Sequence, residues 1–173
     1  CRISDHALDG VPFNRDYSAD DVFVKKMNGE NLSADEINAF KCETLIRLAK
    51  KYSELDWAMQ LHIGALRNNN SAMFKKLGAD VGFDSIADYE IAADLSALLD
   101  AMECNDGLPK TILYTLNPKD NYVLATMIGN FQSAETAGKM QFGSAWWFND
   151  QRDGMVEQMK ALANLGAFNK FVG

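Results

Sequence analysis

The residues best suited to chemistry lie in one short stretch that runs from Gln60 to Asn70. There an apolar run ends at His62, one of only two histidines in the chain, and Gly64, Arg67 and three consecutive amides follow. Histidine exchanges protons near neutral pH and is a common metal ligand. Arginine can hold a carboxylate with two parallel hydrogen bonds. The stretch therefore predicts a site at which His62 is catalytic and Arg67 binds an anionic substrate.

These residues also have ordinary structural interpretations. A histidine beside an apolar run is often a hydrogen-bonded part of the core, and a surface arginine can pair with one of many acids. The position of His62 favours a functional role. It lies at the carboxyl end of a predicted strand over residues 57–63, where α/β enzymes present their site residues. His6 follows Asp5 at the expected end of a first strand, over residues 1–5, so it is a second candidate contact for a substrate.

Two adjacent tryptophans, Trp146 and Trp147, lie in residues 139–148, which read as a strand. On a strand they would face opposite sides, so one is expected to pack in the core and the other to stack on a sugar ring. Asn149 and Asp150 follow, and a helix N-cap with first-turn acids explains them without catalysis. The candidate substrate contacts here are therefore the two tryptophans.

Alternating helices and strands would position these residues. Capping and closing residues predict helices within 18–29, 33–54, 71–77, 85–102, 117–131 and 149–166, with Ser18, Ser33 and Asn117 at the start of three of them. Apolar patterns predict strands over 1–5, 57–63, 111–116, 139–148 and from 168 onward. The strand at 111–116 is β-branched and apolar, as expected of a parallel strand buried on both faces. The expected inward residues include Ile37, Phe40, Thr44, Leu45, Leu48 and Tyr52 on the second helix and Met155, Met159 and Leu162 on the last. The order predicts an α/β fold, with about four parallel strands joined by right-handed crossover helices.

Composition narrows the class of protein. The 173 residues fit one domain, and the net charge of −7 argues against a nucleic-acid partner. No apolar run reaches the roughly 18 residues of a membrane span, and no signal peptide is visible. Three cysteines without CxxC spacing indicate free thiols and a cytoplasmic location. With only two histidines and no HxH, no metal site is certain within the chain, although His62 is a possible ligand.

Two stretches, His62-Ile63-Gly64-Ala65-Leu66-Arg67-Asn68-Asn69-Asn70 and Met140 to Asp153, resemble the uronate isomerases of the amidohydrolase superfamily. The similarity also takes in Cys1 to His6 and Leu116-Asn117-Pro118, and so spans essentially the whole chain. It implies a partial TIM (β/α)8 barrel and a divalent metal, usually zinc. The implied reaction interconverts D-glucuronate with D-fructuronate and D-galacturonate with D-tagaturonate. His62 would lie near metal and substrate, Arg67 at the substrate carboxylate, and Trp146 or Trp147 on the pocket wall.

The sequence departs from the family pattern at both ends. The HxH that follows the family's first barrel strand is absent, and the Asp and Arg of its last strand are expected just after Phe171-Val172-Gly173. The segment is therefore expected to be an internal or C-terminal, middle-to-late part of a larger barrel and inactive alone. Its expected partners are a uronate, the remainder of the barrel and a second copy, since unpaired strand edges promote self-association.

Two other classes of protein remain open at this point. A non-enzymatic α/β module could bind a sugar acid or a protein partner through residues 62–70 and 143–153. The second alternative is a different metal-dependent hydrolase of the same superfamily. The amides after Arg67 and the paired tryptophans favour the isomerase over the hydrolase, because they suit a polyhydroxylated anion better than an apolar amide or ester.

Overall fold

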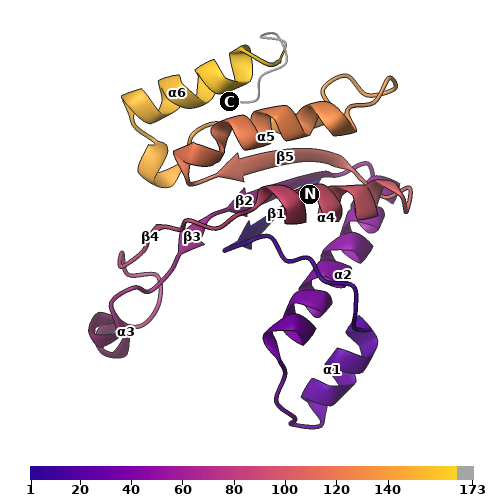
Figure 1. The fold of residues 1–173 in the computed structure, drawn as a ribbon, viewed down its shortest axis with the longest axis vertical. Helices are drawn as coiled ribbons and strands as arrows, with labels where there is room; N and C mark the ends of the chain where they lie inside the picture. Colours follow the sequence, from indigo (N-terminus) through magenta and orange to yellow (C-terminus); the bar gives the residue numbers. More distant parts are fainter. Residues whose placement is uncertain (167–173) are drawn as a thin grey trace. The chain divides into compact units, whose positions relative to one another are not determined.

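The computed structural model describes residues 1–166, which Figure 1 draws as a ribbon. The chain divides into two compact units. The first unit contains Cys1–Ser4, Val11–Met59 and Ile91–Thr111. The second contains Asp5–Gly10, Gln60–Glu90 and the described residues from Ile112 onward. The strand expected from residue 168 lies outside the described residues. No helix within residues 1–166 is long and apolar enough to cross a membrane.

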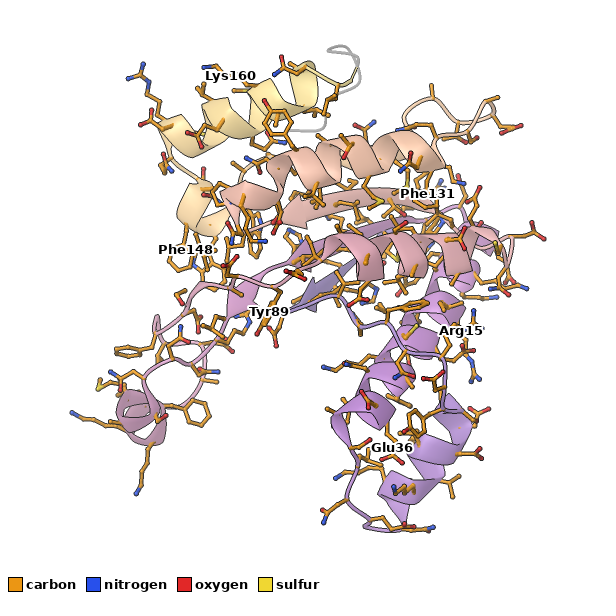
Figure 2. The ribbon with its side chains drawn as sticks, viewed as in Figure 1. Arg15, Glu36, Tyr89, Phe131, Phe148 and Lys160 are labelled. Atoms are coloured by element: carbon orange, nitrogen blue, oxygen red, sulfur yellow. The ribbon has the colours of Figure 1, made fainter. Side chains whose placement is uncertain are left out.

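Helices dominate the first unit: α1 (Ala19–Met27), α2 (Ala34–Glu54) and α4 (Ala92–Glu103). The predicted N-caps of α1 and α2 are confirmed, and α2 begins with a capping box between Ser33 and Glu36. Glu36, labelled in Figure 2, also accepts a hydrogen bond from Lys25 of α1 at 2.7 Å, and this contact holds the pKa of Glu36 below its ordinary value. One side chain therefore both caps α2 and ties it to α1.

The buried face of α2 differs from the expected one. Ile37 and Phe40 are 40% and 36% exposed, and the buried apolar side chains are instead small or medium-sized: Ala39, Cys42, Leu45, Ile46 and Ala49. Small residues at the buried positions let neighbouring backbone approach α2 closely. Phe40 lies outside that face and stacks on Phe23 of α1, with ring centroids 6.4 Å apart. Only part of the predicted face, notably Leu45, is therefore confirmed.

Gly107 shows how closely the first unit packs. A Cβ built at Gly107 would lie 2.9 Å from both Cα and Cβ of Lys50 in α2. Gly107→Ala is therefore expected to lower the free energy of unfolding by about 1–3 kcal/mol, because backbone must move to admit the methyl group. Urea denaturation measures this. Gly129→Ala is the matched control, since nothing lies within 4 Å of its added Cβ; equal midpoints for the two variants would contradict the prediction.

The carboxyl-terminal parts of four parallel strands belong to the second unit, in the order β1-β2-β5-β6. The strands are β1 (Ile3–Leu8), β2 (Ala58–Ile63), β5 (Lys110–Thr115) and β6 (Met140–Phe142). A short antiparallel pair, β3 (Ala65–Leu66) with β4 (Ser85–Ile86), encloses α3 (Ser71–Leu77). Later come α5 (Asn121–Met127) and α6 (Arg152–Ala163), which pack together. The expected α/β fold with crossover helices is confirmed.

Side chains alternate between two unlike faces of this sheet. One face is buried and apolar, with Leu61, Leu113 and Phe142 at most 1% exposed. The opposite face carries His62 and Tyr114, which are only partly buried. The expectation that the strand at 111–116 is buried on both faces is therefore wrong. The half-buried face is the one able to receive a ligand.

Two predicted strands have different extents. The first runs on to Leu8, so Asp5 and His6 lie inside β1 and not at its end. The strand expected over 139–148 stops at Phe142, and Trp147 begins a 3-10 turn with a φ of 52°. The left-handed backbone of Trp147 is incompatible with the continuous extended conformation predicted over residues 139–148.

Two predicted helices begin later than expected. Residues 85 and 86 pair with β3 instead of starting a helix, so α4 begins at Ala92. The N-cap of α6 is Gln151, whose side chain accepts from two backbone N–H groups. Met155 and Met159, expected inward, are 39% and 46% exposed. The buried α6 side chains include Gln158 and Leu162, so Leu162 is the one of the three expected inward residues that is buried.

Candidate functional site

A hydrogen bond between neighbouring strands forms the centre of the site. Nδ1 of His62, near the carboxyl end of β2, lies 2.6 Å from Oδ1 of Asp5 in β1. The His62 side chain is 17% exposed and that of Asp5 is 58% exposed. A carboxylate accepts from the Nδ1–H tautomer, which leaves Nε2 with a lone pair. The pair can therefore take up and release a proton at Nε2.

Two aromatic rings contact the imidazole of His62. Tyr114 of β5 stacks on it, with ring centroids 4.1 Å apart and planes 10° apart. Trp146 meets it edge-on, with centroids 4.6 Å apart. Burial, with a smaller effect of the Asp5 charge, raises the pKa of Tyr114. These contacts fix the plane of the imidazole while Asp5 fixes its direction.

Arg67 lies after β3 and beside the second tryptophan. Its Cζ is 5.3 Å from the centre of the Trp147 ring, a cation–π contact. Its Nη1 is 3.5 Å from Oδ1 of Asp80 and 3.8 Å from Oδ2 of Asp84. Both carboxylate contacts are long, and both are made through Nη1. Arg67 therefore lies between the Trp147 ring and two acids, which partly offset its charge.

The amides that follow Arg67 hold the backbone in place. Asn69 donates to the Leu66 carbonyl and to the Ser85 hydroxyl, both at 2.9 Å, and the Asn70 side chain caps α3. Asp84 accepts from the backbone N–H of Asn68 at 2.7 Å. These interactions give Asn69 and Asn70 structural roles, and they hold the loop that carries Arg67 against residues 84 and 85.

A second set of contacts secures the end of the β4 region. Asn117 donates to the carbonyl of Ala87 at 2.9 Å, and Lys119 donates to the carbonyl of Tyr89 at 2.9 Å. Tyr89 is labelled in Figure 2. Residues just after β5 thereby hold residues 87–89 in place, so the loops at the carboxyl ends of β2 and β5 are joined.

The two tryptophans do not face opposite sides of a strand as expected, since they lie beyond β6. Trp146 has extended backbone and contacts His62, whereas Trp147 stacks on Phe148 (labelled in Figure 2) with centroids 4.9 Å apart. Within residues 1–166, the buried indole Nε1–H of Trp146 has no hydrogen-bond acceptor. The described residues therefore leave this donor unsatisfied.

His6 is placed apart from this cluster. Adjacent residues of a strand point to opposite faces, so His6 lies on the other face of β1 from Asp5. Burial lowers the pKa of His6, against a smaller raising effect of Asp5. The structure therefore pairs His62 with Trp146 and Arg67 with Trp147. The two tryptophan rings link these pairs, with centroids 5.6 Å apart, and His6 is not part of the cluster.

The described residues do not form a complete metal site. No group of three or more His, Cys, Asp and Glu side chains within residues 1–166 is arranged to hold a metal ion. The His62–Asp5 pair does have the pattern in which a ligating imidazole donates its other N–H to a carboxylate. His62 is thus suited to supply one ligand through Nε2, and further ligands would have to come from elsewhere.

Comparisons with known proteins find similarity over the full length of the chain. A family model described as glucuronate isomerase matches residues 1–173. A uronate isomerase from Caldanaerobacter subterraneus is 59% identical over 175 residues, which cover 100% of this chain and 38% of the relative. One from Clostridium perfringens is 56% identical over 176 residues, again covering 38% of the relative. The chain thus spans less than two-fifths of the length of these relatives.

Two solved structures share the fold. The uronate isomerase from Thermotoga maritima superposes with a TM-score of 0.83 at 35% identity, covering 96% of this chain and 36% of that one. The glucuronate isomerase from Caulobacter crescentus gives a TM-score of 0.84 at 26% identity, covering 99% of this chain and 35% of that one. The similarity therefore includes the strands and loops that carry the candidate site.

Proposed function

Because the chain belongs to the glucuronate isomerase family, we propose that the full-length protein interconverts D-glucuronate with D-fructuronate and D-galacturonate with D-tagaturonate. Family membership confirms the resemblance, and it leaves the hydrolase and binding-module alternatives without support. The parallel sheet is then a partial (β/α)8 barrel, as expected. We also propose the cytoplasmic location and the self-association that the sequence suggests.

The observation that carries the proposal is the Asp5–His62 pair on the half-buried sheet face. Isomerisation moves a proton from C2 to C1 of the open-chain sugar and moves the carbonyl group from C1 to C2. Both oxygens therefore change their protonation, which requires a group that takes up and releases protons. We assign that role at one substrate oxygen to Nε2 of His62, with Asp5 stabilising the imidazolium while it holds the extra proton.

Arg67, Trp146 and Trp147 would bind the rest of the sugar acid. The Arg67 fork suits the C6 carboxylate, and the stack on Trp147 limits its movement. The unpaired Trp146 indole N–H would donate to a sugar hydroxyl. His6 is left out of this assignment, because it lies on the opposite face of β1 from Asp5.

We further propose that the full-length enzyme uses a divalent metal, with zinc the expected ion. When bound, such an ion would polarise a substrate oxygen. His62 is the one residue of this chain that could be a ligand. Ligation through Nε2 would replace its proton-transfer role, because Nε2 has a single lone pair. Most ligands would come from outside this chain. The described residues alone do not fit a metal site, so the proton and binding steps above are assigned to side chains only.

The direct test compares the full-length protein with the isolated chain. The full-length protein, supplied with zinc, is expected to turn over D-glucuronate, and the 173-residue chain to give no measurable turnover. Fructuronate formation measures both. Absence of turnover of both uronates by the full-length protein would overturn the proposed function, and turnover by the isolated chain would overturn its predicted inactivity.

Substitution of Arg67 tests the assignment of the carboxylate contact. Arg67→Lys keeps the charge but loses the fork and the stack on Trp147. We expect the KM for D-glucuronate to rise roughly 10-fold to 30-fold, as for the loss of one strong charged hydrogen bond, with a smaller effect on kcat. Arg152→Lys, an exposed arginine in the first turn of α6, is the control. An equal KM for both variants would remove Arg67 from the substrate site.

A further inference from the structure

Tyr114 lies between the catalytic imidazole and a glycine of the next strand region. Its ring stacks on His62, as described above, and also covers the backbone of Gly143. A Cβ built on Gly143 would overlap the Tyr114 ring. The position of the tyrosine ring, and so its stack on His62, therefore depends on the absence of a side chain at residue 143.

The backbone of Gly143 is held on both sides of its Cα atom. Its N–H donates to the carbonyl of Leu113 at 2.9 Å, and its carbonyl accepts from the buried Gln158 side chain. Its φ lies outside the left-handed region. Glycine is therefore needed here for space and not for conformation, and the segment cannot shift easily to admit a methyl group.

The imidazole of His62 needs a lateral support. Asp5 fixes Nδ1 at 2.6 Å, yet a single hydrogen bond leaves the ring free to tilt about that contact. The Tyr114 face, with its plane only 10° from that of His62, blocks tilting on one side. The Trp146 ring meets the imidazole edge-on, with ring centroids 4.6 Å apart. Together these contacts define where Nε2 points.

We propose that Tyr114 is a positioning residue that holds the His62 imidazole in its reactive orientation, with Gly143 providing the space for its ring. The inference rests on the proposed isomerase function, since it concerns the group assigned to proton transfer. The ring makes the contact with His62, so phenylalanine should substitute for tyrosine. A small displacement of a catalytic group lowers the rate of the chemical step more than the binding of substrate.

Kinetics of the full-length protein provide the first test. Tyr114→Phe is expected to keep kcat close to wild type, whereas Tyr114→Leu should lower kcat about 10-fold with little change in KM. Gly143→Ala should lower kcat similarly by displacing the ring. In the Tyr114→Leu background the added methyl group has no ring to displace. Adding Gly143→Ala to that variant should therefore lower kcat little further.

Proton spectra of the full-length protein with 13C-labelled histidine provide a readout besides activity. The His62 ring-proton signals, assigned from their loss in His62→Gln, should be shifted upfield by the Tyr114 ring. That shift should persist in Tyr114→Phe and disappear in Tyr114→Leu. If wild type shows the shift but no turnover, the proposed function fails while the placement of His62 by Tyr114 stands. An unchanged kcat in Tyr114→Leu, or equal losses in the Phe and Leu variants, would overturn the inference.

Discussion

Replacing His62 with glutamine in the full-length protein is expected to lower kcat for D-glucuronate by about 10³-fold. Glutamine can still hydrogen bond with Asp5, but it cannot hold an additional proton at neutral pH. Removal of a positioned acid–base group typically costs about 10²-fold to 10⁴-fold. Since Arg67 and Trp147 are untouched, the KM should change far less than kcat. Initial-rate measurements over a range of D-glucuronate concentrations separate the two constants.

The other histidine supplies the control for this experiment. His6→Gln makes the same chemical change on the opposite face of β1, and we expect its kcat to stay close to wild type. A similar loss in both variants would indicate a general structural effect of the substitution. A His62→Gln enzyme with wild-type kcat would show that the proton carrier lies elsewhere in the full-length protein.

The elements that the sequence predicted well are those with a local chemical signal. Ser18, Ser33 and Asn117 each cap the helix or turn that follows, as their side chains and neighbours indicated. Boundaries failed where long-range contacts compete with local preference. The segment at 85–86 could extend a helix, yet it pairs with β3, and nothing local announces that partner. Ile37 and Phe40 fit an inward helical stripe, but the smaller side chains of α2 took the buried positions.

The candidate site divides in the same way. His62 was recognisable because it ends an apolar strand, and Arg67 because it follows within the same loop. No local pattern singles out Asp5, since its partner lies 57 positions away and the strand around it extends further than predicted. Strand alternation over Ile3–Leu8 is the one signal that could have separated the two faces. Tyr114 and Gly143 meet only through sheet pairing, which single-sequence patterns do not reveal.

Asp5 is expected to show the second largest effect, because it controls which nitrogen of His62 carries the proton. In Asp5→Asn the amide can accept from Nδ1–H or donate to a bare Nδ1, so the tautomer is no longer fixed. The amide also has no charge with which to stabilise the imidazolium. We expect kcat to fall roughly 10²-fold, within the range seen when a carboxylate partner of a functional histidine is removed.

Two measurements distinguish this effect of Asp5→Asn from a general loss of structure. The 15N shifts of the His62 ring should report the Nδ1–H tautomer in wild type and a mixture in the variant. Asp9→Asn, a nearby exposed acid beyond the end of β1, is the control and should leave both kcat and the tautomer unchanged. The double variant Asp5→Asn/His62→Gln should have a kcat close to that of His62→Gln alone, because the carboxylate acts through the imidazole. Additive losses would mean instead that Asp5 acts on the substrate independently of His62.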